Sequence, residues 1–260
     1  MHPMDGLSWA LIALAYLCGA VFVLGFGAKL WAYARTPNPL KIPTTPAPTT
    51  PSGAALRVAG EVLLFRSLFR GNRWTWFFGY AMHVLLAVTL LRHAIVPLGT
   101  PIGNSDLMFQ DLGPFTEAVH TFWDATFRLG LFLPVALLAL LVRRAWVDRT
   151  RYISVAADYA ILLLLLGIAG TGVMMKYLFE PDVEAIHAFV FGLTPGHPFA
   201  PAPWGEPLFI IHFLLVLALL VVFPFSKLMH VGGIFFSPTR NQADNPREVR
   251  HVTPWATPHS

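Results

Sequence analysis

The sequence contains one cysteine and few charged residues. Of its 260 residues, 12% are charged and 55% are hydrophobic, and the mean hydropathy is +0.59. A soluble domain carries about 25% charged residues, so this composition indicates an integral membrane protein. Because Cys18 has no second cysteine, an intrachain disulfide, a cysteine-bound iron–sulfur cluster and a covalent CxxCH haem site are excluded. The sequence also lacks a nucleophile elbow, a phosphate loop and a zinc-type cluster, so it indicates no chemistry on a soluble substrate.

Long apolar runs dominate the chain. A membrane-spanning helix needs about 20 residues, because each residue adds about 1.5 Å of length. The first run has no basic segment before it and no small-residue cleavage site, so we expect a retained helix and not a signal peptide. The runs predict an all-α membrane domain over residues 1–236 with five spanning helices, at about 8–32, 74–97, 120–142, 153–177 and 206–230.

Basic residues are absent from every second connection. Connections 98–119 and 178–205 contain no lysine or arginine, whereas 34–73, 143–152 and the tail after 236 contain several. Basic loops stay on the cytoplasmic side of a membrane. The alternation therefore predicts a multi-pass protein of the cell inner membrane with a periplasmic N-terminus and a cytoplasmic C-terminus.

Two polar segments are expected on the cytoplasmic side. KIPTTPAPTTPSG (41–53) is rich in proline and threonine, which predicts an extended tether. Segment 54–71 alternates arginines with leucine, valine and phenylalanine, which predicts an amphipathic helix on the membrane surface or on a partner. The tail 237–260 contains four prolines and cannot build a core, so it is either disordered or laid across a soluble subunit.

Four histidines lie within two predicted spans. His83 and His93 are on the second, and His212 and His230 are on the fifth. Because these spans are antiparallel in the predicted topology, His93 and His212 share the outer depth and His83 and His230 the inner depth. The separations correspond to rises of about 15 Å and about 27 Å. His212 and His230 share one helix face, whereas His83 and His93 lie about 80° apart.

Imidazole is costly in hydrocarbon unless it has a partner. A haem iron with two axial histidines satisfies two facing imidazoles at once. The four histidines therefore predict two non-covalent b haems, with His93 and His212 as the outer axial ligands and His83 and His230 as the inner ones. For any single histidine, the alternative is a polar contact between helices or a proton relay.

Other residues near these histidines have two interpretations each. The glycines of GIAGTG (167–172) either let a macrocycle approach or serve ordinary helix packing. Arg92 and Lys227 are candidates for haem propionate contacts, or reach lipid headgroups. Pro224 is expected to kink the fifth span before His230.

A quinone site is predicted at the outer end. A lipid quinol loses two protons with its two electrons, so proton acceptors are needed there. The candidates are Arg92, His120 and Asp124, with His187 as a weaker one. The alternative for His120 is an interfacial or helix-end contact.

The histidine spacing, with five helices and an outside N-terminus, resembles the respiratory nitrate reductase gamma-subunit family of dihaem cytochrome b proteins. Nine residues separate His83 from His93, and seventeen separate His212 from His230. Four segments look closest to DsrM, the cytochrome b membrane subunit of the Dsr (dissimilatory sulfite reductase-associated) complex: KIPTTPAPTT (41–50), FGYAMHVLLAVTLLRH (78–93), RYISVAADY (151–159) and FFSPTRNQADNPREVRHVTPWA (235–256). The resemblance covers nearly the whole chain, and the tail favours the Dsr branch.

The resemblance implies a function for the two haems. Such a subunit exchanges electrons with menaquinone near the outer haem and relays them through the inner haem to a cytoplasmic, heterodisulfide reductase-like iron–sulfur subunit that acts on a small sulfur carrier. A periplasmic multihaem cytochrome c and further membrane and iron–sulfur subunits are implied partners, in sulfite reduction or sulfur oxidation. Nitrate reductase members use a lysine near the quinone, for which this sequence has no clear equivalent. The direction of electron flow stays open.

The sequence is also compatible with three other functions. One is the gamma-subunit of a respiratory nitrate reductase or of a heterodisulfide reductase-like complex. Another is a proton-coupled transporter with histidine relays, although only Asp158 lies well inside a span and no repeated half is present. The third is a scaffold that anchors a soluble complex through 34–73 and the tail. A catalytic residue and a nucleic acid partner are not expected.

Overall fold

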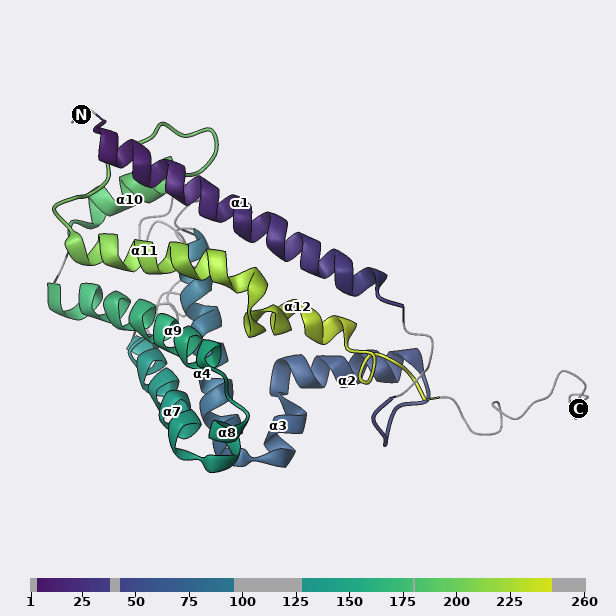
Figure 1. The fold of residues 1–260 in the computed structure, drawn as a ribbon. Coiled ribbons are helices and arrows are strands. Elements are labelled where there is room, and N and C mark those ends of the chain that lie inside the picture. Colours follow the sequence, from purple (N-terminus) through teal and green to yellow (C-terminus); the bar gives the residue numbers. More distant parts are fainter. Residues whose placement is uncertain (1–3, 38–42, 96–127, 180, 245–260) are drawn as a thin grey trace, which may run out of the picture.

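The computed structural model describes residues 4–37, 43–95, 128–179 and 181–244. Throughout these ranges the regular elements are helices, as Figure 1 shows. The predicted all-α class therefore holds for the described part of the chain. The quinone candidates His120 and Asp124 lie outside it.

Four helices among the described residues are long and apolar enough to cross a membrane. They are α1 (Gly6–Arg35), α4 (Arg73–Ile95), α9 (Ala156–Met174) with its π-helical extension Met175–Phe179, and α11 (Pro207–Val222) with the turn that follows it. Their mean hydropathy lies between 1.5 and 2.9, and at most 22% of the most apolar window of each is buried. Soluble monomers rarely expose such continuous apolar surface, so these helices present the outer surface that lipid chains require.

The third predicted span is interrupted. Residues 120–127 of the helix predicted over 120–142 lie outside the described ranges, and within the described part a turn at residues 130–131 precedes α7 (Phe132–Trp146). Pro134 explains the break, since it has no N–H and its ring clashes with the carbonyl four residues earlier, at Gly130. The helix α7 has 15 residues, which is shorter than a full bilayer crossing.

The fifth predicted span is also broken. Residues 206–230 do not form one helix, because α11 ends at Val222 and Ser226 is extended, with φ −121° and ψ 176°. Short 3₁₀ turns on both sides of Ser226 lead into α12 (His230–Gly233). Pro224 causes the break, and α1 approaches it closely: a Cβ on Gly25 would lie 2.8 Å from Pro224 Cβ. The inference that His212 and His230 share one face of one helix is therefore wrong.

The helices pack in the order α1, α11, α9, α7, α4, as can be followed in Figure 1. One core joins α1 and α11 to α10 (Val183–Gly192), a helix in the connection predicted as a loop, and includes Leu11, Phe189 and Phe209. A second core joins α7 and α9 through Leu133, Leu137 and Leu165. The second core also reaches α4, because Met82 and Leu85 pack against it. The four histidines are carried by α4, α11 and α12.

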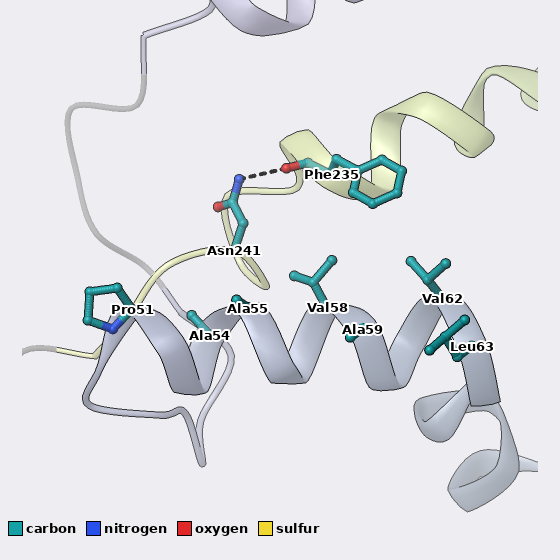
Figure 2. Close-up of a pocket in the computed structure, with 9 residues that line it drawn as sticks. All are labelled: Pro51, Ala54, Ala55, Val58, Ala59, Val62, Leu63, Phe235 and Asn241. Carbon is teal, nitrogen blue, oxygen red and sulfur yellow. Dashed lines mark hydrogen bonds between the residues drawn. The ribbon is translucent and has the colours of Figure 1, made fainter.

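The amphipathic segment forms two helices. They are α2 (Pro51–Leu64), which begins three residues before the predicted start at 54, and α3 (Arg66–Gly71). Phe65 between them has a left-handed backbone, with φ 49°. The described part of the tail returns to α2, where Arg240 Nη1 lies 3.0 Å from Glu61 Oε1. A groove of about 520 Å³ runs between them (Figure 2), and none of the four histidines lines it.

Candidate functional site

The inner histidine pair is formed by α4 and α12. His83 Nε2 lies 3.5 Å from His230 Nε2, and the two ring planes are 79° apart. His83 is half-buried, whereas His230 is exposed. The break in the fifth span does not separate this pair, because the turns after Pro224 bring His230 back towards α4.

The outer pair is formed by α4 and α11. The ring centroids of His93 and His212 are 6.4 Å apart, and their planes differ by 24°. The structure thus brings the four histidines into the two pairs expected from their depth. Their role as haem ligands stays a prediction, because it concerns chemistry and not placement.

The Nδ1 atom of each of the four histidines has a hydrogen-bond partner. In His83, His93 and His230 the partner is a backbone carbonyl of the same segment: Gly79 at 2.7 Å, Thr89 at 2.8 Å and Lys227 at 2.7 Å respectively. A carbonyl can only accept, so these Nδ1 atoms carry the proton of the neutral ring. The lone pair is then on Nε2, which is the form that binds a metal.

In His212, the hydrogen-bond partner of Nδ1 is a side chain and not a carbonyl. Its Nδ1 lies 2.9 Å from Thr171 Oγ1, on α9. That hydroxyl has one hydrogen, which it donates to the carbonyl of Gly167 at 2.8 Å or Ile168 at 3.0 Å. With the hydroxyl hydrogen on a carbonyl, the hydroxyl oxygen accepts from His212 Nδ1–H, and this is the tautomer that leaves Nε2 free to coordinate.

The donor set fits haem better than a bare metal ion. Imidazole nitrogen binds a first-row transition metal such as zinc at about 2 Å, so two nitrogens on opposite sides of one ion are about 4 Å apart. The inner Nε2 atoms, 3.5 Å apart, are close to that separation. Within the described ranges, no group of three or more His, Cys, Asp or Glu side chains is placed to hold an ion. Two histidines per centre suit an iron whose other ligands come from a porphyrin.

A glycine and a phenylalanine lie directly against two of the four histidine rings. A Cβ on Gly172 would lie 3.5 Å from His212 Cε1, so within GIAGTG this glycine faces a histidine ring. A Cβ on Gly167 would instead lie 3.4 Å from Leu215 Cδ1, which is ordinary packing between α9 and α11. On the inner side, the Phe65 ring meets His83 edge-on, with centroids 4.9 Å apart. Sequence reasoning did not single out Phe65 or Thr171, because both contacts join segments far apart in the chain.

Lys227 has a protein partner. Its Nζ lies 2.8 Å from Asp158 Oδ2, and Arg144 Nη1 lies 2.9 Å from the same oxygen. The Lys227 side chain is otherwise 69% exposed. Its predicted contact with a propionate would compete with this ion pair. The sequence did contain a signal for Asp158, since a carboxylate inside an apolar span is rare.

Of the four candidates for the outer quinone site, Arg92 and His187 lie in the described ranges. Arg92 is half-buried on α4 directly before His93. His187 is half-buried on α10, and its ring stacks on Phe191 with centroids 5.8 Å apart. The roles of Arg92, His120 and Asp124 at a quinone stay predictions.

Comparison with known proteins identifies two relatives that align with nearly the whole of this chain. The chain is 33% identical over 277 residues to the Hdr-like menaquinol oxidoreductase cytochrome b-like subunit of Archaeoglobus fulgidus, covering 94% of this chain and 82% of the relative. It is 32% identical over 277 residues to the subunit of the same name from Archaeoglobus profundus, covering 94% and 81%. No protein-family model matches the chain. These relatives bear neither the Dsr nor the nitrate reductase name, so those finer assignments stay predictions.

Proposed function

Because the chain belongs to the family of Hdr-like menaquinol oxidoreductase cytochrome b-like subunits, we propose that it is a membrane dihaem cytochrome b that exchanges electrons with a quinone. The observation that carries this proposal is the pairing of the four histidines and the hydrogen bond that each makes through Nδ1. Each Nδ1 has a hydrogen-bond partner, and the rings form two pairs across the helices. Two b haems bound there would supply one-electron carriers at two depths.

The chain's own residues orient and tune these centres. A histidine whose Nδ1–H is held by an acceptor keeps one tautomer and one ring orientation, and it becomes a stronger base at Nε2. His83, His93 and His230 bond to carbonyls of their own segment. His212 is held by α9 through Thr171. The outer centre is therefore sensitive to the spacing of α9 and α11.

The quinone is proposed to react at the outer end. The relatives are named for menaquinol, and the outer pair is the nearer one to the connections expected outside the membrane. Arg92 would position the quinone beside His93, and His120 or Asp124 would take up its protons. Protons released there reach the outer aqueous phase if the N-terminus is periplasmic.

The cytoplasmic side is proposed to pass electrons to an iron–sulfur subunit. The inner histidine His83 contacts Phe65 between α2 and α3, so this segment lies beside the inner centre. A heterodisulfide reductase-like partner in sulfite reduction or sulfur oxidation is the proposed context, with further subunits such as a periplasmic multihaem cytochrome c. A nitrate reductase gamma-subunit would differ in its partner and not in its two haems.

Haem content and quinone reactivity test the proposal together. Protein purified from haem-sufficient cells should give two b haems per chain in a pyridine haemochrome assay. A redox titration should resolve two midpoint potentials, and a menaquinol analogue should reduce both haems. A colourless preparation would overturn the proposal and favour a proton-coupled transporter. Two haems that no quinol reduces would favour a scaffold.

A further inference from the structure

A buried carboxylate joins the broken fifth span to two other helices. Asp158, in the first turn of α9, is 5% exposed. Its Oδ2 lies 2.9 Å from Arg144 Nη1 of α7 and 2.8 Å from Lys227 Nζ. The same oxygen accepts the Val155 N–H at 3.2 Å. Asp158 is the only charged residue in the buried core of the described ranges.

The burial of the Asp158 carboxylate constrains the positions of its partners. A buried charge costs several kcal/mol unless it is paired and hydrogen-bonded. Asp158 meets that requirement through the two cations and the Val155 N–H, and in Lys227→Met the contacts with Arg144 and Val155 remain. The segment that carries Lys227 is therefore held where its Nζ can reach the carboxylate.

Lys227 is also the hydrogen-bond partner of an inner ligand. Its backbone carbonyl accepts from His230 Nδ1 at 2.7 Å. The helical ladder of α11 does not extend to this segment, because it ends at Val222 and the chain is extended at Ser226. The Asp158 ion pair is thus a direct tertiary restraint on the residue that orients His230.

We propose that Asp158 is a positioning residue for the inner haem, acting through Lys227 on the ring orientation of His230. This inference rests on the proposed dihaem function. It gives Lys227 a role different from a propionate contact: its ammonium holds Asp158 while its carbonyl holds His230. The outer pair shares none of these contacts, since His93 and His212 bond to Thr89 and Thr171.

Two substitutions should disturb the inner haem alone. Asp158→Asn removes the charge while it keeps the shape, and Lys227→Met removes the ammonium. Both should change the low-spin electron paramagnetic resonance signal and the midpoint potential of the inner haem, and both should lower haem content from two towards one per chain. The signal and potential of the outer haem should stay as in the wild type. His83→Ala identifies which signal belongs to the inner haem.

Two further variants serve as controls. Lys227→Arg keeps the cation and should restore the wild-type inner signal. Asp148→Asn removes an 87% exposed carboxylate that pairs with Arg151 at the surface, at 3.0 Å, and it should change neither haem. If Asp158→Asn does not accumulate in the membrane, Lys227→Met decides, because that side chain is 69% exposed and its loss should not prevent folding.

Two results would overturn the inference. One is an unchanged inner haem signal and potential in Lys227→Met and in any folded Asp158→Asn protein. The other is equal loss of both haems in step with loss of folded protein, which would assign Asp158 to overall stability. Wild-type protein is assayed in parallel: if it binds no haem, the proposed function fails, and if it binds two, only the positioning role is at stake.

Discussion

Thr171 Oγ1 and His212 Nδ1 are joined across the α9–α11 interface by a 2.9 Å hydrogen bond. The other three ligand candidates use carbonyl acceptors of their own segment. A hydroxyl that already donates to the backbone is a single, replaceable acceptor. The outer pair can therefore be altered by one side-chain substitution outside the histidines.

Removing the Thr171 hydroxyl should weaken the outer haem site. Thr171→Val keeps the shape but leaves His212 Nδ1–H without its acceptor, and loss of such a partner typically costs about 10- to 100-fold in metal affinity. We expect partial loss of the outer haem and a shifted outer potential, measured by haemochrome assay and redox titration. Thr171→Ser retains the hydroxyl and should resemble the wild type. A Thr171→Val protein with both potentials unchanged would contradict the assigned hydrogen-bond direction.

Each histidine pair should lose its own haem independently. His93→Ala removes one outer ligand and should leave one b haem, with the inner spectrum and potential retained. His83→Ala should do the converse. His197→Ala, at an exposed histidine outside both pairs, is the control and should retain two haems. If His93→Ala keeps both haems, the pairing by depth is wrong.

Close packing of α1 on the helix break should tolerate no side chain at residue 25. A Cβ there would lie 2.8 Å from Pro224 Cβ, which is fixed by its ring. Overpacking of this kind costs about 1–3 kcal/mol, so Gly25→Ala should lower the unfolding temperature in detergent. Gly27→Ala is a matched control on the same helix, because a Cβ at Gly27 meets nothing within 4 Å. It should be neutral or slightly stabilising. Equal effects of the two substitutions would show that α1 does not pack there.

The contact between α2 and residues 237–244 should weaken in acid. Burial acts to raise the pKa of Glu61, but hydrogen bonds from Ser67 and the charges of Arg240 and Arg57 lower it more, so the pKa lies below 4.5. A carboxyl whose folded pKa is depressed contributes its full stabilisation above the unfolded value, and this is lost as the pH falls through the folded value. The protection factors of residues 237–244 against hydrogen exchange, corrected for the intrinsic exchange rate at each pH, should therefore fall below about pH 4.5.

Glu61→Gln supplies the control for that measurement. Glutamine does not titrate, so the protection factors of residues 237–244 should be lower than in the wild type at neutral pH and should not fall further in acid. A wild-type profile that persists in the variant would mean that another group controls the contact.

Arg92 should affect the quinone reaction more than haem binding. If it positions the quinone head beside His93, Arg92→Gln should slow reduction by a menaquinol analogue while two haems remain bound. Reduction by dithionite, which needs no quinone site, is the control and should be unaffected. Loss of the outer haem in this variant would instead indicate a propionate contact.

The membrane-spanning helices and the two histidine pairs could be predicted from the sequence, because they depend on the composition of each segment and on the spacing within it. Apolar runs of bilayer length identified four described spans, and the offsets between histidines put His93 level with His212 and His83 level with His230. The interruptions at residues 130–131 and after Val222 were harder to place. Pro134 and Pro224 were visible, but a proline inside an apolar run can bend a helix or end it, and neighbouring helices decide which.

Hydrophobicity and helical rise are properties of each segment alone, so composition predicts a membrane protein and the offsets between histidines predict which imidazoles form a pair. The cross-helix partners of His212 and Lys227 depend instead on how the helices pack. Thr171 lies 41 residues from His212, and Asp158 lies 69 residues from Lys227. Such contacts form when separate helices pack, so their partners are set by the approach of α7, α9 and α11 and not by spacing along any one of them.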